Sequence, residues 1–238
     1  SSAAAARPHV TQDSSKGGQI TITGTQHTAT VIGPIHGLGD TNMGWADVAG
    51  HLHGGMPHVR FVLPNAPISR VTLNGGMSMP SWYDITSLTD DRANQKCAGI
   101  QQSHHAITAL IKEEVAAGIP LDRIVVAGFS QGGAMSLFSG LQYPGKLAGV
   151  LVMSGYLAAE DQFSLSTQNA NTPVGHFHGK ADPTVRIEWA RQTAERLRAL
   201  GHTDYTLYEY EDLGHSATME EIADVQVWLE SHLPYLEK

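Results

Sequence analysis

The sequence predicts an α/β fold in which helices cover both faces of a mostly parallel sheet. Strand-like apolar runs alternate with helical patterns along most of the chain, an order typical of parallel sheets. Two runs, Ile124–Phe129 and Ala148–Met153, are apolar almost without interruption, as strands buried on both faces are. Because chemistry in such folds lies outside the carboxyl ends of the strands, functional residues are expected in the loops that follow them.

The expected strands are short and rich in β-branched or other apolar residues. The first two are rich in the β-branched residues Thr, Ile and Val taken together, and the third ends at the turn sequence Pro64-Asn65-Ala66-Pro67. The expected strands are Gln19–Gly24, Ala29–Ile35, Val59–Leu63, Ile124–Phe129, Ala148–Met153, Val174–His178 and Tyr205–Tyr210.

Apolar residues at helical spacing predict the helices, and glycine or proline marks their ends. The longest pattern stops at Gly118, another stops before Pro144, and a third begins after Pro183. The expected helices are Trp45–Leu52, Arg92–Ala117, Gln131–Gln142, Thr184–Leu200 and Thr218–Leu233. The segment Val71–Asp84 is expected to be irregular, because Gly, Met and Pro occur there together.

The composition is that of a folded chain. Of 238 residues, 41% are hydrophobic and only 16% are charged, which permits a sizeable core and excludes a disordered protein. Residues 1–18 are rich in Ser, Ala and Gly and lack the apolar segment of a secretory signal, so a disordered tail is expected there, with a trimmed transit peptide as the alternative. Residues 19–238 contain no repeat or linker and are expected to form a single domain.

The charge and the cysteine count exclude several classes of function. The formal net charge is −8, without basic runs, which argues against nucleic acid or an anionic membrane as the main partner. Cys97 is the only cysteine, so an intrachain disulfide and a Cys-based zinc site are excluded. A single thiol fits a reducing compartment, and a cytoplasmic location is expected. No apolar run approaches the ~18 residues of a membrane helix.

A candidate nucleophile stands in Gly128-Phe129-Ser130-Gln131-Gly132, which matches the pattern G-x-S-x-G. The pattern alone is weak, but here a buried strand leads into Ser130 and a helix begins directly after it. This is the strand–turn–helix context of a nucleophile elbow, where small flanking residues permit a sharp turn. The alternative is a serine that caps a helix N-terminus.

A serine nucleophile needs a base, and the base needs an orienting acid. His215 follows the strand Tyr205–Tyr210, and Asp182 follows the strand Val174–His178, so both lie at carboxyl ends. The order Ser130, Asp182, His215 is that of a Ser-Asp-His triad in α/β-hydrolases. For Asp182 the alternative role is a helix N-cap.

Two further patterns concern the oxyanion and metals. The Gly-rich turn His36–Thr41 can aim a backbone N–H at a developing oxyanion, with the N–H of Gln131 as second donor; an ordinary connection is the alternative. Thirteen histidines include 51 and 53, 104 and 105, and 176 and 178, but H-E-x-x-H is absent and no spacing places a third ligand. A catalytic metal is therefore not expected.

These motifs together resemble the acyl-protein thioesterase/lysophospholipase group of α/β-hydrolase carboxylesterases. The matching segments span roughly residues 29–233 in that family's order. They are His36-Gly37-Leu38-Gly39-Asp40-Thr41, Gly44-Trp45, Pro64-Asn65-Ala66-Pro67, Val71-Thr72-Leu73-Asn74, Met79-Pro80-Ser81-Trp82-Tyr83-Asp84-Ile85, Gly118-Ile119-Pro120, Gly128–Ala134, Lys146–Val150, His178-Gly179, Asp182-Pro183 and Gly214-His215-Ser216.

The resemblance implies an α/β-hydrolase fold without a large cap domain, no cofactor and no metal. It implies Ser130 as nucleophile, His215 as base, Asp182 as acid, and the N–H groups of Leu38 and Gln131 as the oxyanion hole. The loop Val71–Trp82 corresponds to the family's acyl-binding loop, where Leu73, Met77, Met79 and Trp82 are the apolar residues offered as an acyl groove. Packing of these side chains in the core is the alternative.

The implied substrates are palmitoylated proteins, lysophospholipids and simple esters. A hydrolase of S-palmitoyl-cysteine is expected, and the alternative is a general carboxylesterase or lysophospholipase without a protein substrate. An inactive acyl-binding module is a third interpretation, which the intact triad disfavours. Transient contact with a membrane surface and a monomer or weak dimer are also expected. One departure from the family is Gly33-Pro34, where a bulge or an early strand end is expected, because proline cannot donate to the ladder.

Overall fold

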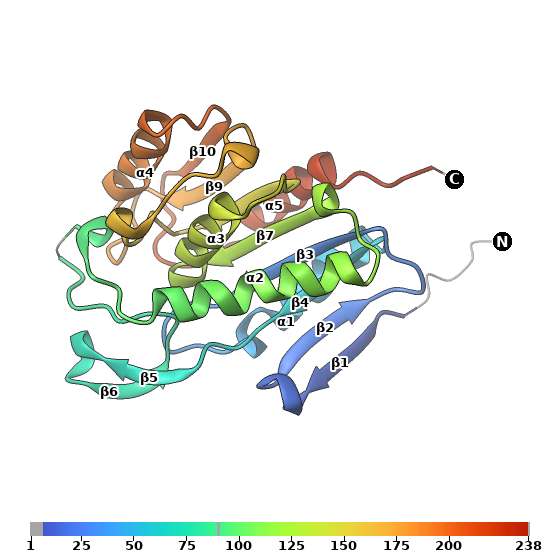
Figure 1. Cartoon of the computed structure of the whole chain (residues 1–238), viewed down its shortest axis with the longest axis horizontal. Coiled ribbons are helices and arrows are strands. Elements are labelled where there is room, and N and C mark those ends of the chain that lie inside the picture. Colours follow the sequence, from blue (N-terminus) through green and yellow to red (C-terminus); the bar gives the residue numbers. More distant parts are fainter. Residues whose placement is uncertain (1–6, 90, 238) are drawn as a thin grey trace.

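The computed structural model describes residues 7–89 and 91–237 and contains an eight-stranded sheet and a separate two-stranded hairpin (Figure 1). The strand order in the large sheet is β1-β2-β4-β3-β7-β8-β9-β10. In that order the strands are His9–Asp13, Gln19–Thr23, Val59–Leu63, Ala29–Ile35, Ile124–Phe129, Gly149–Met153, Val174–Gly179 and Tyr205–Tyr210. The hairpin pairs β5, Ile68–Val71, with β6, Met77–Pro80.

Strand direction divides the large sheet into two parts. The strands β4, β3, β7, β8, β9 and β10 are parallel to one another. In contrast, β2 is antiparallel to both β1 and β4. The carboxyl ends of β3, β7 and β9 therefore meet at one edge of the sheet, where the candidate residues were expected.

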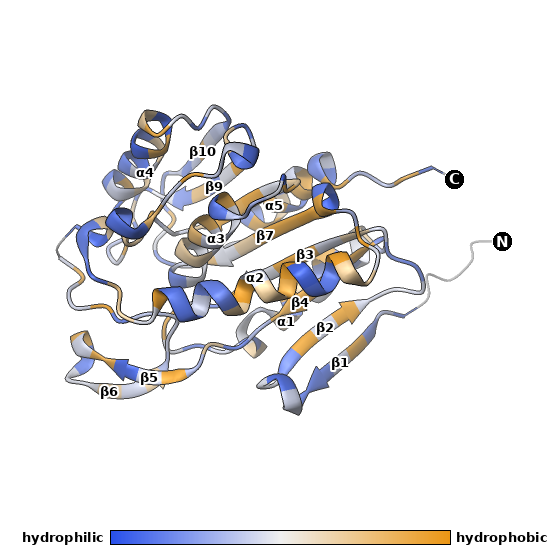
Figure 2. Cartoon of the chain, in the orientation of Figure 1, coloured by the Kyte–Doolittle hydropathy of each residue, from blue (hydrophilic) through white to orange (hydrophobic). Residues whose placement is uncertain are grey.

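Helices cover both faces of the sheet. They are α1 Met43–Gly55, α2 Ile100–Ala116, α3 Gln131–Gln142, α4 Ile187–Ala199 and α5 Met219–His232. Side chains of α2, α3 and α4 share one apolar cluster, whereas those of α1 and α5 share another on the opposite face. In Figure 2, β7 is mostly hydrophobic, whereas α2 alternates between hydrophobic and hydrophilic residues, as expected for a helix that covers a sheet.

The central strands supply both clusters. Val125 packs in the α1/α5 cluster and its neighbour Val126 in the α2/α3/α4 cluster, because successive side chains point to opposite faces of a strand. This accounts for the uninterrupted apolar run in the sequence. The predicted α/β-hydrolase fold is confirmed, and no large cap domain covers the sheet within the described residues.

The N-terminal segment differs from the expected disordered tail. Residues 1–6 lie outside the described residues, but His9–Asp13 forms β1, which pairs with β2. Asp13 then caps a short 3-10 helix by accepting a hydrogen bond from the N–H of Ser15 at 2.9 Å. The folded part therefore begins before Gln19. The β1 side chains are all exposed, so no apolar periodicity marks this edge strand in the sequence.

The segment 92–117 also differs from its prediction. A 3-10 turn at Arg92–Asn94 is separated from α2, which begins at Ile100. Cys97 has φ 51° and Gly99 has φ 94°. Left-handed backbone cannot continue a right-handed helix, so the turn and α2 remain separate.

The proline in β3 produces the expected bulge without ending the strand. The pairing of β3 with β7 shifts register between Ile32 and Ile35, and the strand continues to Ile35. The peptide bond between Gly33 and Pro34 is cis.

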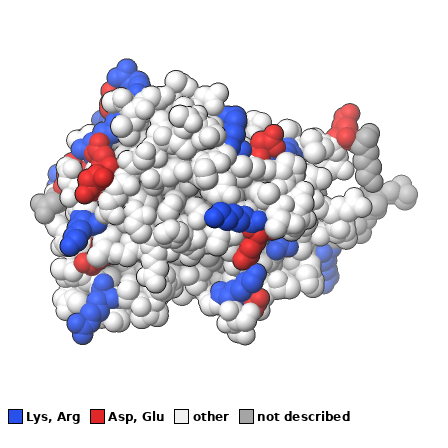
Figure 3. Space-filling view, viewed as in Figure 1, with Lys and Arg blue, Asp and Glu red and all other residues white. Residues whose placement is uncertain are grey.

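The visible surface carries few and mixed charges. Lys, Arg, Asp and Glu are scattered over the face in Figure 3 without a continuous patch of either sign. No helix within residues 7–89 and 91–237 is both long and apolar enough to cross a bilayer.

Candidate active site

Ser130 occupies a strained turn between β7 and α3. Its φ of 57° and ψ of −119° place a non-glycine residue in a rarely populated region. Its N–H donates to the carbonyl of Met153 at 2.8 Å, and its own carbonyl accepts from the N–H of Ala134 at 3.0 Å. Such strain is retained where the surrounding structure determines it, and it is typical of a nucleophile elbow.

The flanking glycines are required by the packing at this turn. A Cβ on Gly128 would overlap the carbonyl oxygen of Gly132, and a Cβ on Gly132 would overlap the carbonyl oxygen of Ile35. Gly37 approaches from the next loop, where an added Cβ would lie 3.3 Å from the Cβ of Ser130. The steric interpretation of the G-x-S-x-G pattern therefore agrees with the geometry.

His215 and Asp182 are joined by a hydrogen bond. The Nδ1 of His215 lies 2.7 Å from the Oδ2 of Asp182, although 33 residues separate them in sequence. The carboxylate is fully buried, whereas the His215 side chain is 20% exposed. The two residues that the sequence analysis selected as acid and base are therefore hydrogen-bonded to each other.

Asp182 is held ionised by its surroundings. Burial by itself raises the pKa of this carboxyl. The hydrogen bond from His215 and the backbone N–H groups of Val185 and Thr184 outweigh burial, so the pKa is lowered overall. Both N–H groups donate to Oδ1 at 2.9 Å. Because an ionised carboxylate only accepts, Nδ1 of His215 is the donor, so in the neutral imidazole the free lone pair is on Nε2.

One cavity brings the nucleophile and the histidine together. A cavity of about 350 Å³ is lined by Ser130, His215, Phe129, Gly37 and Leu38, among others. The ring of His215 lies 5.0 Å from that of Phe129, measured between centroids.

Two backbone N–H groups are free near Ser130, one on Leu38, which lines this cavity, and one on Gln131, which follows Ser130 in the chain. Within the described residues, the N–H groups of Leu38 and Gln131 have no hydrogen-bond acceptor. Gln131 is the first residue of α3, where helix geometry leaves N–H groups unpaired. The turn before Leu38 is fixed, because His36 Nδ1 donates to the carbonyl of Gly37 at 2.8 Å and its Nε2 accepts from the N–H of Ala66 at 3.0 Å.

A family model described as Phospholipase/Carboxylesterase matches residues 16–233. The chain belongs to this family. Acyl-protein thioesterase 1 of Neurospora crassa is 42% identical over 219 residues, which cover 88% of this chain and 89% of that protein. Acyl-protein thioesterase 1 homolog 1 of Dictyostelium discoideum is 39% identical over 213 residues, which cover 88% of this chain and 93% of that protein. The resemblance inferred from the motifs is confirmed.

Solved structures show the same fold. Arabidopsis thaliana SOBER1 matches with a TM-score of 0.80 and 26% identity, covering 86% of this chain and 99% of that one. Zea mays acyl-protein thioesterase 2 matches with a TM-score of 0.73 and 26% identity, covering 96% of this chain and 99% of that one.

The four residues that were expected to form the acyl groove lie in different environments in the structure. Leu73 lines the cavity that contains Ser130. Met77 lies on β6 and is 65% exposed, and Met79 lies beside Gly39. Trp82 is buried and packs on His36. The β5–β6 hairpin replaces part of the expected irregular segment, and the cavity lining does not include Met77, Met79 or Trp82.

The amide side chain of Gln131 has a role that the motif did not reveal. Its Oε1 accepts from the N–H of Trp82 at 2.8 Å, and its Nε2 donates to the carbonyl of Tyr83 at 2.7 Å. The indole N–H of Trp82 donates in turn to the carbonyl of His36 at 2.9 Å. These bonds fix segment 82–83 against both loops of the cavity. Only the three-dimensional contact identifies this role.

Residues beyond the predicted set also line the cavity. Ile85, Leu88 and Arg92 come from the segment that follows the hairpin. Thr184 comes from the loop of Asp182, two residues further along the chain. Sequence reasoning assigned Arg92 to a helix and therefore to no site.

Two histidines extend the hydrogen-bond network behind Asp182. The Nε2 of His178 donates to the carbonyl of Val185 at 2.7 Å and lies 3.7 Å from the Oδ2 of Asp182. The Nε2 of His176 lies 3.1 Å from the Nδ1 of His178. Burial lowers the pKa of both histidines and so keeps them neutral. The negative charge of Asp182 is therefore available to stabilise a positive charge on His215. Within the described residues, no three His, Cys, Asp or Glu side chains converge as a metal site requires.

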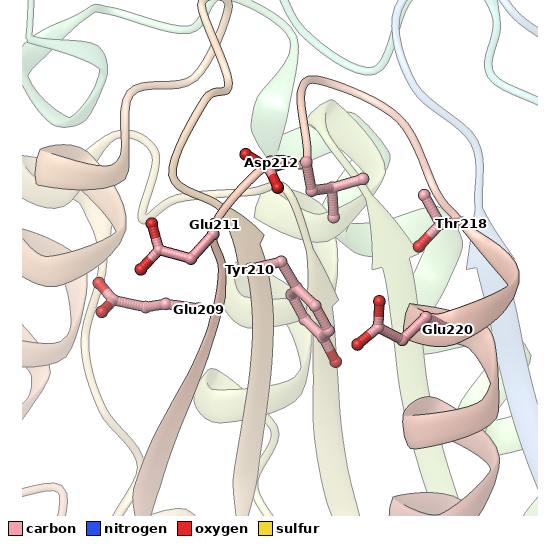
Figure 4. Close-up of a pocket in the computed structure, with 7 residues that line it drawn as sticks. Glu209, Tyr210, Glu211, Asp212, Thr218 and Glu220 are labelled. Atoms are coloured by element: carbon pink, nitrogen blue, oxygen red, sulfur yellow. The ribbon is translucent and has the colours of Figure 1, made fainter.

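A separate acidic pocket lies between the end of β10 and the start of α5. Figure 4 shows Glu209, Glu211, Asp212 and Glu220 around it, with Tyr210 between them. Asp212 is therefore part of another pocket, although it precedes His215 by only three residues.

Glu221 is a buried carboxyl group near the acid of the site. It lies in the first turn of α5, and neither of its oxygens has a hydrogen-bond partner within the described residues. Burial raises its pKa to about 8, and the negative charges of Asp224 and Asp182 add to the effect. The native protein therefore holds this proton at neutral pH.

Glu221 is expected to make stability pH-dependent. Between the ordinary value of 4.5 and about 8, the folded state keeps a proton that the unfolded chain has released, so stability falls as pH rises through this window. Glu221→Gln removes this dependence. The melting temperatures of the two proteins should differ little near pH 5, and the variant should melt at the higher temperature near pH 9. A wild-type advantage that grows with pH would contradict the assignment.

Proposed function

We propose that this protein hydrolyses acyl thioesters and carboxylic esters through an acyl-enzyme on Ser130. The hydrogen bond between His215 Nδ1 and Asp182 Oδ2, beside a strained serine that lines the same cavity, is the observation that carries the proposal. A helix-capping serine needs neither a histidine nor a strained backbone, so this geometry favours catalysis over the capping role.

The proposed reaction begins with proton transfer from Ser130. The Nε2 of His215 has a free lone pair because Nδ1–H is bound to Asp182. It accepts the hydroxyl proton while the serine oxygen attacks the acyl carbonyl carbon. The positive charge that forms on the imidazole is stabilised by the buried carboxylate of Asp182.

The N–H groups of Leu38 and Gln131 form the proposed oxyanion hole. The carbonyl oxygen becomes negatively charged as the tetrahedral intermediate forms, and fixed N–H donors stabilise that charge. The bonds of His36 and of the Gln131 side chain hold both donors in place.

The second half of the reaction releases both products. His215 donates its proton to the leaving thiolate or alkoxide as the bond to the acyl carbon breaks. It then takes a proton from water, whose oxygen attacks the acyl-enzyme and frees a carboxylic acid. Ser130 recovers its proton from His215, so the enzyme is unchanged after one turnover.

We infer S-palmitoyl-cysteine of proteins as the principal substrate. The support is similarity of about 40% over most of the chain to proteins called acyl-protein thioesterase 1. A general carboxylesterase or lysophospholipase is the second candidate, favoured by the name of the matching family model. We propose that the enzyme acts in the cytoplasm as a monomer or weak dimer that contacts membrane surfaces transiently; the single buried thiol of Cys97 supports a reducing compartment.

The test is active-site labelling followed by a matched substrate panel. A fluorophosphonate probe should label one residue, Ser130, and mass spectrometry of the digested protein should locate the label. Turnover of a palmitoyl-peptide thioester, a palmitoyl lysophospholipid and a short aryl ester then separates the candidates. No label at Ser130 and no turnover in the panel would contradict the proposal.

Leu73 is expected to contribute selectively to long acyl chains. It lines the cavity that contains Ser130, and each methylene withdrawn from water contributes about 0.8 kcal/mol. Leu73→Ala should lower kcat/KM for palmitoyl substrates by roughly tenfold and leave acetyl esters nearly unchanged. Met77→Ala is the matched control, because Met77 belongs to the same hairpin but is exposed. Equal losses on acetyl and palmitoyl substrates would mean that Leu73 only supports the core.

A further inference from the structure

Arg92 is a buried cation at the wall of the cavity that contains Ser130. It belongs to the 3-10 turn Arg92–Asn94, and only 3% of its surface is exposed. The cavity lining includes Arg92 together with Ser130 and His215. A guanidinium group is always protonated in proteins, so a permanent positive charge lies at the proposed substrate site.

Among the residues that the structure describes, no carboxylate is paired with this charge. Within the described residues, Arg92 forms no ion pair. The neighbouring Asp91 is bound to Arg196 instead, with Oδ2 2.7 Å from Nη2 of that arginine. Glu160 is also paired with Arg196, at 3.2 Å.

The partners that Arg92 does have are neutral and few. Nη1 donates to the hydroxyl of Tyr156, and Nη2 donates to the carbonyl of Thr184, both at 3.1 Å. Nε has no acceptor, although it is buried. The ring centroids of Tyr156 and Trp189 lie 5.1 and 5.4 Å from the guanidinium carbon. Their cation–π attraction offsets part of the hydration energy that Arg92 loses on burial.

A purely structural role does not account for this arrangement. Buried charges are normally paired, and an arginine that only joins two loops would be expected to have a carboxylate partner. The unpaired charge and the unsatisfied Nε–H instead suit a ligand that brings its own negative charge. Asp40 is the acidic side chain that shares the cavity lining, and it is exposed, so water screens it.

We propose that Arg92 determines substrate specificity by binding an anionic oxygen group, a carboxylate or a phosphate, on the ester or thioester substrate. The inference rests on the proposed function, because it assumes that the cavity holds the substrate of Ser130. A buried donor site discriminates strongly against a substrate that lacks the acceptor, since the donors are then left unpaired. Apolar side chains at the cavity, Leu73, Ile85 and Leu88, would contact the acyl chain of the same substrate.

The first experiment compares charged and capped forms of one acyl chain. The substrates are p-nitrophenyl monoesters of glutaric, adipic and suberic acid, and the same compounds with the distal carboxyl as a methyl ester. For at least one chain length, the wild-type protein should prefer the free carboxylate by roughly tenfold or more in kcat/KM. A preference for the methyl ester at every length would exclude an anionic group on the acyl chain and leave the leaving alcohol as its only place.

The second experiment removes the charge. Arg92→Met should lower kcat/KM for the free carboxylate by a larger factor than for p-nitrophenyl butyrate, so that the preference is lost, and Arg92→Lys should restore part of the preference. An equal loss on charged and neutral substrates in a folded Arg92→Met protein would indicate a structural role and overturn the proposal. Turnover of neutral esters without any preference refutes only this inference, whereas no turnover of any ester refutes the proposed function itself.

The third experiment distinguishes the two sources of negative charge. It compares 1-hexanoyl-glycerol 3-phosphate with 1-hexanoyl-glycerol, beside the carboxylate pair. Preference for the phosphate in the wild-type protein, lost in Arg92→Met, would place the anionic group on the leaving alcohol. Preference confined to the carboxylate pair would place it on the acyl chain. Absence of both preferences overturns the proposal.

Discussion

Ser130→Ala is expected to lower kcat by about 10⁶-fold, because no other group can replace the attacking oxygen. The backbone of the elbow is fixed by hydrogen bonds to Met153 and Ala134 that do not involve the hydroxyl, so the fold should be retained. The measurement is steady-state hydrolysis of a short aryl ester, with circular dichroism to check folding.

The control for this variant is Ser78→Ala. Ser78 is exposed on β6 and lies outside the cavity lining, so its removal should leave kcat unchanged. Fluorophosphonate labelling should disappear in Ser130→Ala and persist in Ser78→Ala. Retention of a tenth of wild-type activity by Ser130→Ala would refute the assignment of the nucleophile.

The parts of the fold that could be predicted are those in which the local pattern and the tertiary contacts agree. The run Ile124–Phe129 is apolar because both faces of β7 are covered, and Gly128 and Gly132 are small because the elbow leaves no space for a Cβ. The order of strands and loops along the chain predicted that Asp182 and His215 follow the carboxyl ends of β9 and β10. In the structure their side chains are hydrogen-bonded there.

The parts that could not be predicted depend on contacts between distant segments. Every side chain of β1 is exposed, and the strand forms by pairing with β2. Its sequence therefore has no apolar pattern and looks like that of a disordered tail. Arg92 fits the helical spacing of α2, but the left-handed residues Cys97 and Gly99 separate it from that helix and turn it toward the cavity. The neutral histidine pair behind Asp182 likewise requires the register of β9, which no local pattern specifies.

Asp182→Asn is expected to lower kcat by roughly 10⁴-fold, because it reverses the proton arrangement of His215. The Oδ1 of Asp182 accepts two backbone N–H groups, from Thr184 and Val185, so the oxygen of an asparagine amide would occupy that position. Its NH2 group would then face His215 and require Nδ1 to accept. The histidine proton would move to Nε2, which could no longer take the proton of Ser130.

Asp212→Asn is the matched control, since Asp212 is close to His215 in sequence but lines the acidic pocket of Figure 4. It should change kcat by far less than Asp182→Asn does. Both variants should be compared with wild type in kcat and in thermal unfolding. Otherwise, a fall in activity that is caused by unfolding could be mistaken for the loss of the catalytic carboxylate. If Asp212→Asn proves to be the costly change while Asp182→Asn remains active, the acid of the triad has been assigned to the wrong loop.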